Sequence, residues 1–176
     1  MSVVLRELSA WSLVGLSLVP SAHYAGVRIV TTPSVPMGLY ATRALGEDEV
    51  PGVGAYVCLP PLSSEGPRAL RQAFADGLLP SAWRTRPLLK RVSATAGDVV
   101  TYSEAGVLVN GRALPSSVAL RVDRQGNALP APLYPQQLGP SEVWLASEHP
   151  RGFDSRYFGP VRVEALTCVG EPLWTI

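Results

Sequence analysis

Histidine, cysteine and lysine are all scarce in this sequence, and each shortage limits the chemistry that the chain can support. Its 176 residues include only 2 histidines, 2 cysteines and a single lysine, Lys90. Protein zinc sites combine several cysteine and histidine ligands at short spacings. Cys58 and Cys168 are far apart and have no histidine beside them at such a spacing, so we expect no metal site.

An excess of charge of one sign is also lacking. The 15 Lys and Arg residues are scattered among 14 acidic residues, which leaves a formal net charge of +1. A nucleic-acid-binding protein usually presents a broad basic surface that neutralises phosphates. The sequence therefore predicts no nucleic-acid partner.

Long helical patterns are rare after the first thirty residues. The 17 prolines and 16 glycines separate short segments rich in Val, Leu, Tyr and Thr, which is typical of a mainly β protein. The strands are expected within residues 27–40, 54–59, 88–95, 99–114, 142–147, 157–163 and 165–170. At this length the chain forms one ordinary domain, with room for a small insertion.

One helix and one long loop interrupt the predicted strands. The helix is expected over residues 65–79, because Pro67 suits a first turn and Leu70, Phe74 and Leu78 recur at four-residue spacing. Residues 116–140 are rich in Pro, Gly, Gln and Asn and are expected to be loop-rich.

The two cysteines lie in the strand-like runs AYVCLP and ALTCVG. A small buried thiol is the commoner state of a cysteine in such a run, and a disulfide between them is the alternative.

The N-terminus carries the longest uncharged segment of the chain. Residues 8–27 have no formal charge, and twenty residues is about the length of a helix that crosses a bilayer. We predict a signal anchor in residues 1–28, with a cleaved signal peptide and a buried soluble helix as alternatives. Arg6 favours a cytoplasmic N-terminus, which places the rest of the chain on the far side of the membrane.

Ser34 and Lys90 are the strongest candidates for chemistry. A serine hydroxyl needs a neighbouring base to become a nucleophile. His149 is the one plausible triad histidine and no Gly-x-Ser-x-Gly elbow is present, so a Ser-His-Asp mechanism is disfavoured.

Lys90 lies in the apolar run PLLKRV, where burial would lower the pKa of its ammonium and let it act as a base. The alternatives are an outward or ion-paired lysine and an ordinary turn serine between Pro33 and Pro36.

Four segments in order resemble a known family. They are TTPSVPMGLY, GVGAYVCLPP, PLLKRVSATAGDVV and SEHPRGFDSRYFGPV, and they span residues 31–161. The chain resembles the type I signal peptidases, and most closely the conjugative-transfer (TraF-type) signal peptidases that mature pilin precursors. The resemblance implies Ser34 as nucleophile and Lys90 as general base. It also implies an oxyanion site formed by the main-chain N–H of Ser34 and by Thr32.

The last segment supplies the supporting residues. The resemblance implies that Asp154 pairs with Arg156 and that Ser155 helps to fix the strand beside Lys90. One departure concerns Gly152, because the family commonly has there a serine that orients the lysine. Either another hydroxyl takes its place, or Lys90 is held less well.

The resemblance also implies the fold, the partners and the location. The expected fold is mainly β, with twisted antiparallel sheets of the signal-peptidase and LexA-like kind in residues 29–176 and a small inserted subdomain at about 99–141. No cofactor is implied. The substrate would be an exported precursor such as a pilin, which is cleaved or cyclised. The protein would be a single-pass inner-membrane protein with a periplasmic catalytic domain that meets secretion or pilus machinery.

Three other functions compete with this interpretation. A self-cleaving repressor of the LexA kind shares the Ser-Lys pair, but no helix-turn-helix pattern is present here. A general secretory peptidase would process ordinary signal peptides. A membrane-tethered, catalytically weak or inactive β module would scaffold a secretion or pilus apparatus, and Gly152 is the residue that favours it.

Overall fold

The computed structural model describes residues 26–60, 62, 64 and 66–176. The predicted signal anchor lies almost wholly outside these residues. Within the part of the chain that is described, no helix is both long and apolar enough to cross a membrane.

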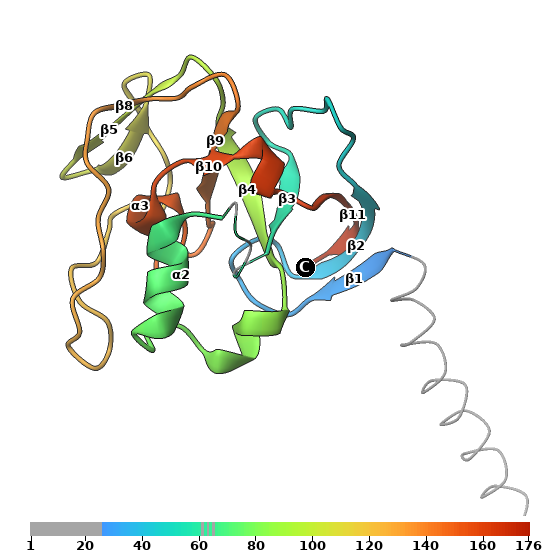
Figure 1. The fold of residues 1–176 in the computed structure, drawn as a ribbon, viewed down its shortest axis with the longest axis horizontal. Coiled ribbons are helices and arrows are strands. Elements are labelled where there is room, and N and C mark those ends of the chain that lie inside the picture. The colour runs from blue at the N-terminus through green and yellow to red at the C-terminus, as the bar shows by residue number, and fades with distance from the viewer. Residues whose placement is uncertain (1–25, 61, 63, 65) are drawn as a thin grey trace, which may run out of the picture.

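An antiparallel sheet of seven strands forms the centre of the described chain (Figure 1). Its strand order is β1-β2-β11-β3-β4-β9-β10, so the C-terminal strand is inserted between two strands from the first third of the chain. The predicted mainly β class is therefore confirmed. The strands are β1 (Val27–Val30), β2 (Gly38–Ala44), β3 (Tyr56–Leu59), β4 (Leu88–Ala94), β9 (Glu142–Ala146), β10 (Val161–Arg162) and β11 (Cys168–Thr175).

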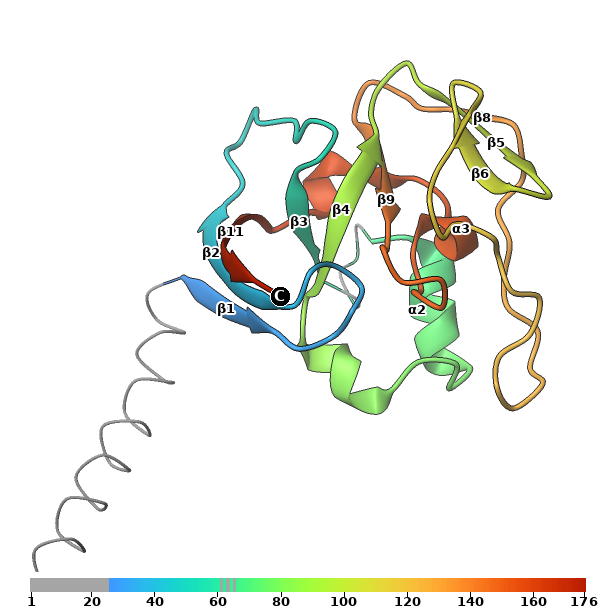
Figure 2. The ribbon, with the colours of Figure 1, turned by 180° about the vertical axis from the view of Figure 1, so that it is seen from behind.

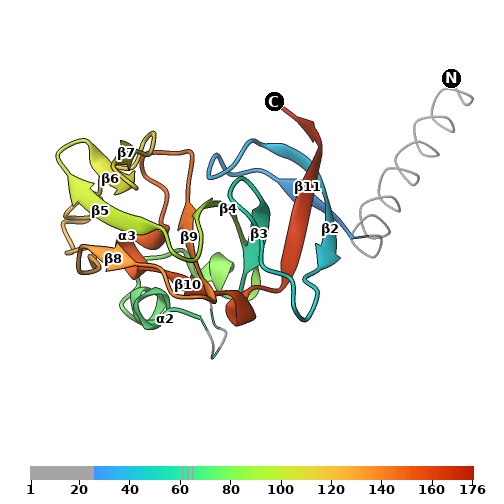
Figure 3. The ribbon, with the colours of Figure 1, turned by 90° about the horizontal axis from the view of Figure 1, so that it is seen from above.

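A second, four-stranded sheet is built from residues between β4 and β9, with the order β7-β6-β5-β8. It lies at the end of the molecule opposite to β1, β2 and β11 (Figure 3). Asn110 and Gly111 form the turn between β6 and β7, and both have positive φ, as a two-residue hairpin turn requires. Its strands are β5 (Val99–Ser103), β6 (Gly106–Val109), β7 (Arg112–Ala113) and β8 (Gln136–Gln137).

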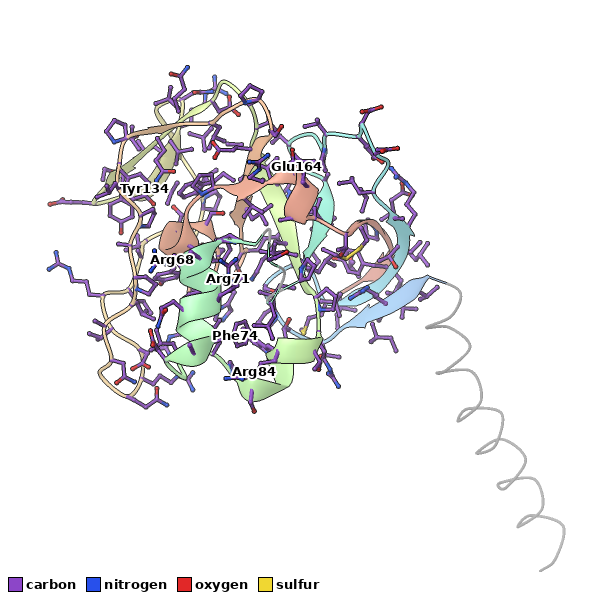
Figure 4. The ribbon with its side chains drawn as sticks, in the orientation of Figure 1. Arg68, Arg71, Phe74, Arg84, Tyr134 and Glu164 are labelled. Carbon is purple, nitrogen blue, oxygen red and sulfur yellow. A yellow bond between two sulfur atoms is a disulfide. The ribbon has the colours of Figure 1, made fainter. Side chains whose placement is uncertain are left out.

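The main helix, α2 (Arg68–Ala75), is shorter than the predicted 65–79. Leu70 and Phe74 are buried as expected, but the helix ends before Leu78 because Gly77 adopts a left-handed φ of 72°. A 3₁₀ helix, η1 (Ser81–Thr85), follows, and its Arg84 donates a hydrogen bond to the carbonyl of Phe74 (Figure 4).

The strand predicted over residues 157–163 is wrong at its start. Residues Ser155–Phe158 form a short helix, α3, because the Asp154 side chain accepts the main-chain N–H of Arg156 and Gly159 ends the turn with a φ of 78°. Only Val161–Arg162 of that segment is a strand, and a 3₁₀ helix, η2 (Val163–Ala165), follows it.

Cys58 and Cys168 form a disulfide, so the expectation of two buried thiols is wrong. They stand directly opposite each other on β3 and β11, with their Cα atoms 4.9 Å apart. Both belong to a buried cluster with Val35, Tyr40 and Leu89. The bridge joins residues 110 positions apart in the sequence, at the point where the C-terminal strand enters the sheet.

Replacing both cysteines with alanine is expected to lower the free energy of unfolding by about 2–5 kcal/mol, because a cross-link over a long loop restricts the unfolded chain. Urea denaturation of the double variant and the oxidised wild type would measure the difference. Thiol titration of the unfolded wild type is the control, and an unchanged free energy with no titratable thiol in the wild type would contradict the prediction.

Candidate active site

Ser34 lies in the loop between β1 and β2 and is half-buried. Its carbonyl accepts a hydrogen bond of 3.0 Å from the main-chain N–H of Glu148, just beyond β9. The next residue, Val35, is fully buried, and Pro36 accepts a 2.7 Å hydrogen bond from the Tyr40 hydroxyl. The loop is therefore held at both sides of Ser34, and Figure 2 shows it beside the segment that follows β9.

Thr32 shares this exposed side of the loop with Ser34. Its Oγ1 lies 3.4 Å from Ser34 Oγ. Both hydroxyls are therefore accessible from the same side of the loop.

Lys90 lies in the middle of β4 and is only 3% exposed, so the alternative of an outward-facing lysine is wrong. Its strand partner on β3 is Val57, and Val92, two residues along β4, lies on the same face. Both valines belong to the main buried cluster. Burial lowers the pKa of Lys90 to about 8, while Asp154 raises it and Arg156 lowers it. No hydrogen bond to Lys90 Nζ occurs among the described residues.

Asp154 and Arg156 form a buried ion pair beside this strand. Arg156 Nη2 lies 2.7 Å from Asp154 Oδ2, Nε lies 2.8 Å from Oδ1, and both side chains are 2% exposed. Burial lowers the pKa of Arg156, but the hydrogen bonds and charge of Asp154 outweigh it and raise that pKa. Arg156 also donates to the carbonyls of Ser116, Val118, His149 and Pro150.

Ser155 is fully buried, and its hydroxyl accepts a 2.9 Å hydrogen bond from the main-chain N–H of Leu145. It therefore ties α3 to strand β9, which lies beside the strand of Lys90. This contact agrees with a role in fixing the sheet beside the lysine.

Ser147 was not singled out from the sequence, although it ends the strand-like run EVWLAS. It is 3% exposed, and its main-chain N–H donates a 2.8 Å hydrogen bond to Asp154 Oδ2. The neighbouring Glu148 binds the carbonyl of Ser34. The end of β9 thus connects the serine loop to the buried ion pair, and it runs alongside the strand of Lys90.

The described residues contain no group of three His, Cys, Asp or Glu side chains that could hold a metal ion.

The sequence matches a known protein family over the part of the chain that contains the buried lysine and the ion pair. Residues 65–174 match the family described as "Signal peptidase, peptidase S26". The chain belongs to this family and is a peptidase-type hydrolase. The match includes Lys90 and Asp154, while Ser34 lies before its first residue.

Individual relatives extend the similarity over nearly the whole chain. The sequence is 36% identical over 166 residues to a "Plasmid transfer protein TraF" of Escherichia coli, which covers 91% of this chain and 89% of that protein. A second E. coli protein of that name is 34% identical and covers 99% of each chain. A "Probable conjugal transfer protein TraF" of Sinorhizobium fredii is 31% identical and covers 98% of this chain and 89% of its own. These matches confirm the TraF-type resemblance.

Among solved structures, the crystal structure of a signal peptidase I from Enterococcus faecalis V583 is similar. It is 18% identical, has a TM-score of 0.38, and covers 67% of this chain and 94% of its own.

Proposed function

We propose that this protein is a serine endopeptidase in which Ser34 is the nucleophile and Lys90 is the general base. Its substrate would be an exported precursor, most specifically a pilin or another component of a conjugation or type IV secretion system. The observation that carries the proposal is the burial of the chain's single lysine, with a pKa of about 8, in the strand beside the segment that holds the Ser34 loop. A lysine in that environment is neutral in a useful fraction of molecules near neutral pH.

The first half of the reaction forms an acyl-enzyme. Ser34 Oγ attacks the carbonyl carbon of the scissile peptide bond as its proton passes to Lys90 Nζ. The negative charge on the carbonyl oxygen is stabilised by the Ser34 main-chain N–H and the Thr32 hydroxyl. The C–N bond then breaks, and Lys90 returns the proton to the leaving amine.

The second half releases the product. Water attacks the acyl-enzyme to give a linear product with a new carboxylate, while Lys90 again accepts and returns a proton. If the attacking group is the substrate's own amino terminus, the product is a cyclic peptide. In either case an extended substrate segment would pair with an exposed strand edge, and β1, which leads directly into the Ser34 loop, is an edge strand of the described sheet.

The membrane and periplasmic assignments belong to this proposal. A disulfide persists in an oxidising compartment, so the Cys58–Cys168 bridge supports a catalytic domain outside the cytoplasm. An anchor in residues 1–28 would place it there. The relatives named for plasmid and conjugal transfer support secretion or pilus machinery as the partner.

The test is processing of a co-expressed candidate pilin precursor by the full chain, read by intact mass. The wild type is expected to shorten the precursor, and Ser34→Ala is expected to leave it intact. The control is Ser81→Ala, which alters an exposed serine in η1 and is expected to process the precursor like the wild type. A linear and a cyclic product differ by one water. Processing by Ser34→Ala would overturn the assignment, and a folded wild type that is inactive on several precursors would favour the scaffold module.

A further inference from the structure

We propose that Ser147 is a positioning residue for Lys90: a change of side-chain rotamer lets its hydroxyl oxygen accept a hydrogen bond from the Lys90 amine, which directs the nitrogen lone pair towards Ser34. This inference rests on the proposed Ser34–Lys90 chemistry. It assigns a role to a buried hydroxyl at the start of the fourth segment, SEHPRGFDSRYFGPV, to which the family resemblance gave none.

The strand register places Ser147 opposite Lys90. In the β4–β9 ladder, Val92 pairs with Leu145 and Arg91 pairs with Ala146. One further step along this antiparallel register brings Lys90 opposite Ser147. Directly opposite side chains lie on the same face of a sheet, with Cβ atoms about 4.5–5.5 Å apart. Both side chains are 3% exposed, so they share a nearly dry environment.

The hydrogen-bonding capacity of the two groups is complementary. A serine oxygen accepts two hydrogen bonds, and Ser147 Oγ accepts one at 3.2 Å from the main-chain N–H of His149. One acceptor position therefore remains. Lys90 Nζ makes no hydrogen bond among the residues that the structure describes, so its donors are available to a nearby acceptor. By the strand register, Ser147 and Lys90 have their side chains on the same face of the sheet.

Gly152 shows that the space for an orienting side chain is already filled. A Cβ atom built on Gly152 would lie 2.0 Å from Ser147 Oγ and 2.2 Å from Ser147 Cβ. The backbone of Gly152 does not have the positive φ that would itself require glycine. Residues 147 and 152 therefore compete for one volume, and in this chain it holds the hydroxyl of Ser147. Of the two alternatives for Gly152, substitution by another hydroxyl is the one that this geometry favours.

A hydrogen bond from the amine to Ser147 has a defined consequence for the base. Neutral Lys90 has two N–H donors and one lone pair, and the proposed reaction needs the lone pair to point at Ser34. An acceptor just beyond the end of β9 would hold one N–H bond and limit the rotation of the amine. The carbonyl of Ser34 is held by the residue that follows Ser147, so the same strand end positions both reacting groups.

Two charged groups act on Lys90. Asp154 raises its pKa and Arg156 lowers it, from the segment around α3. Tyr56 on β3, which is opposite Arg91, and Glu148, which pairs with Arg91, belong to the other face of the sheet. Because an acceptor stabilises the ammonium more than the neutral amine, loss of the Ser147 hydroxyl is expected to lower the pKa of Lys90 further.

The single lysine makes a direct test possible. Protein labelled with ¹⁵N at the lysine Nζ gives one side-chain signal, which reports the pKa of Lys90 without any substrate. We expect Ser147→Ala to lower that pKa by at least about half a unit. We also expect it to lower the plateau kcat/KM for a precursor about tenfold or more, with the acid limb of the pH profile moved to lower pH. This variant keeps the Ser147 Cβ and the main-chain N–H that binds Asp154, so the fold is preserved.

A hydroxyl swap provides the rescue. Ser147→Gly is expected to lose the same activity, and Ser147→Gly combined with Gly152→Ser is expected to recover most of it, because the second change returns a hydroxyl to the vacated volume. A Lys90 pKa equal to that of the wild type in folded Ser147→Ala would overturn the proposal, even if activity fell. A shifted pKa in a chain whose wild type processes no precursor would refute the proposed function and leave the Lys90–Ser147 contact standing.

Discussion

The Lys90→Met variant is expected to lose processing activity by about 10³-fold or more, because it removes the amine that we propose as the general base for Ser34. Methionine preserves most of the side-chain volume in a buried position. Activity would be measured as kcat/KM for precursor cleavage. Wild-type-like turnover by this variant would contradict the assignment of Lys90 as the base.

The same variant is expected to be more stable than the wild type at pH 7. The pKa of Lys90 falls from its ordinary value of 10.5 to about 8 in the folded protein. The folded state therefore binds fewer protons than the unfolded state between these values, and wild-type stability rises with pH across that window. Below pH 8 the buried ammonium costs on the order of 3 kcal/mol, since each pKa unit corresponds to about 1.4 kcal/mol. Urea denaturation of both proteins at pH 7 and pH 10 would show the gain shrinking as pH rises.

Wild-type activity should depend on pH through the same group. At pH 7, about a tenth of the molecules carry neutral Lys90, so kcat/KM is expected to rise nearly tenfold per pH unit up to about 8 and then level off. A pH-rate profile that was flat between pH 6 and 8 would show that the base is another group.

The Asp154→Ala variant is expected to lower the free energy of unfolding by about 3–5 kcal/mol. The change leaves the Arg156 guanidinium buried without its carboxylate and removes the acceptor of the Ser147 main-chain N–H. Thermal or urea unfolding would measure the loss. An Asp98→Ala variant, which alters a carboxylate in the turn before β5, is a comparison outside the ion pair.

A double-mutant cycle separates the ion pair from the remaining contacts. Asp154→Ala combined with Arg156→Met is expected to be less destabilised than the sum of the two single variants, because no unpaired charge stays buried. Additive effects would indicate that the carbonyl partners of Arg156, and not Asp154, supply most of its stabilising contacts.

Much of the fold followed from local patterns, and the errors also have local causes. The β class and the turn at Asn110-Gly111 were predictable, because strand alternation and positive-φ turns are encoded by nearby residues. The helix after Pro67 was predicted too long because Gly77 stops it. The helical turn of Tyr157 and Phe158 was missed because an Asp154 cap overrides their strand propensity.

The candidate site, too, could be predicted only in part from the sequence. The sequence by itself determined which residues were available for the chemistry, since one lysine and a serine between two prolines leave few alternatives. Only the tertiary structure decided that Lys90 is buried, that Cys58 bonds to Cys168, and that Ser147 takes the space beside Gly152. Each of these depends on which strands are neighbours and in what register. Strand order and register are properties of long-range pairing between β3, β4, β9 and β11, and no short stretch of sequence contains them.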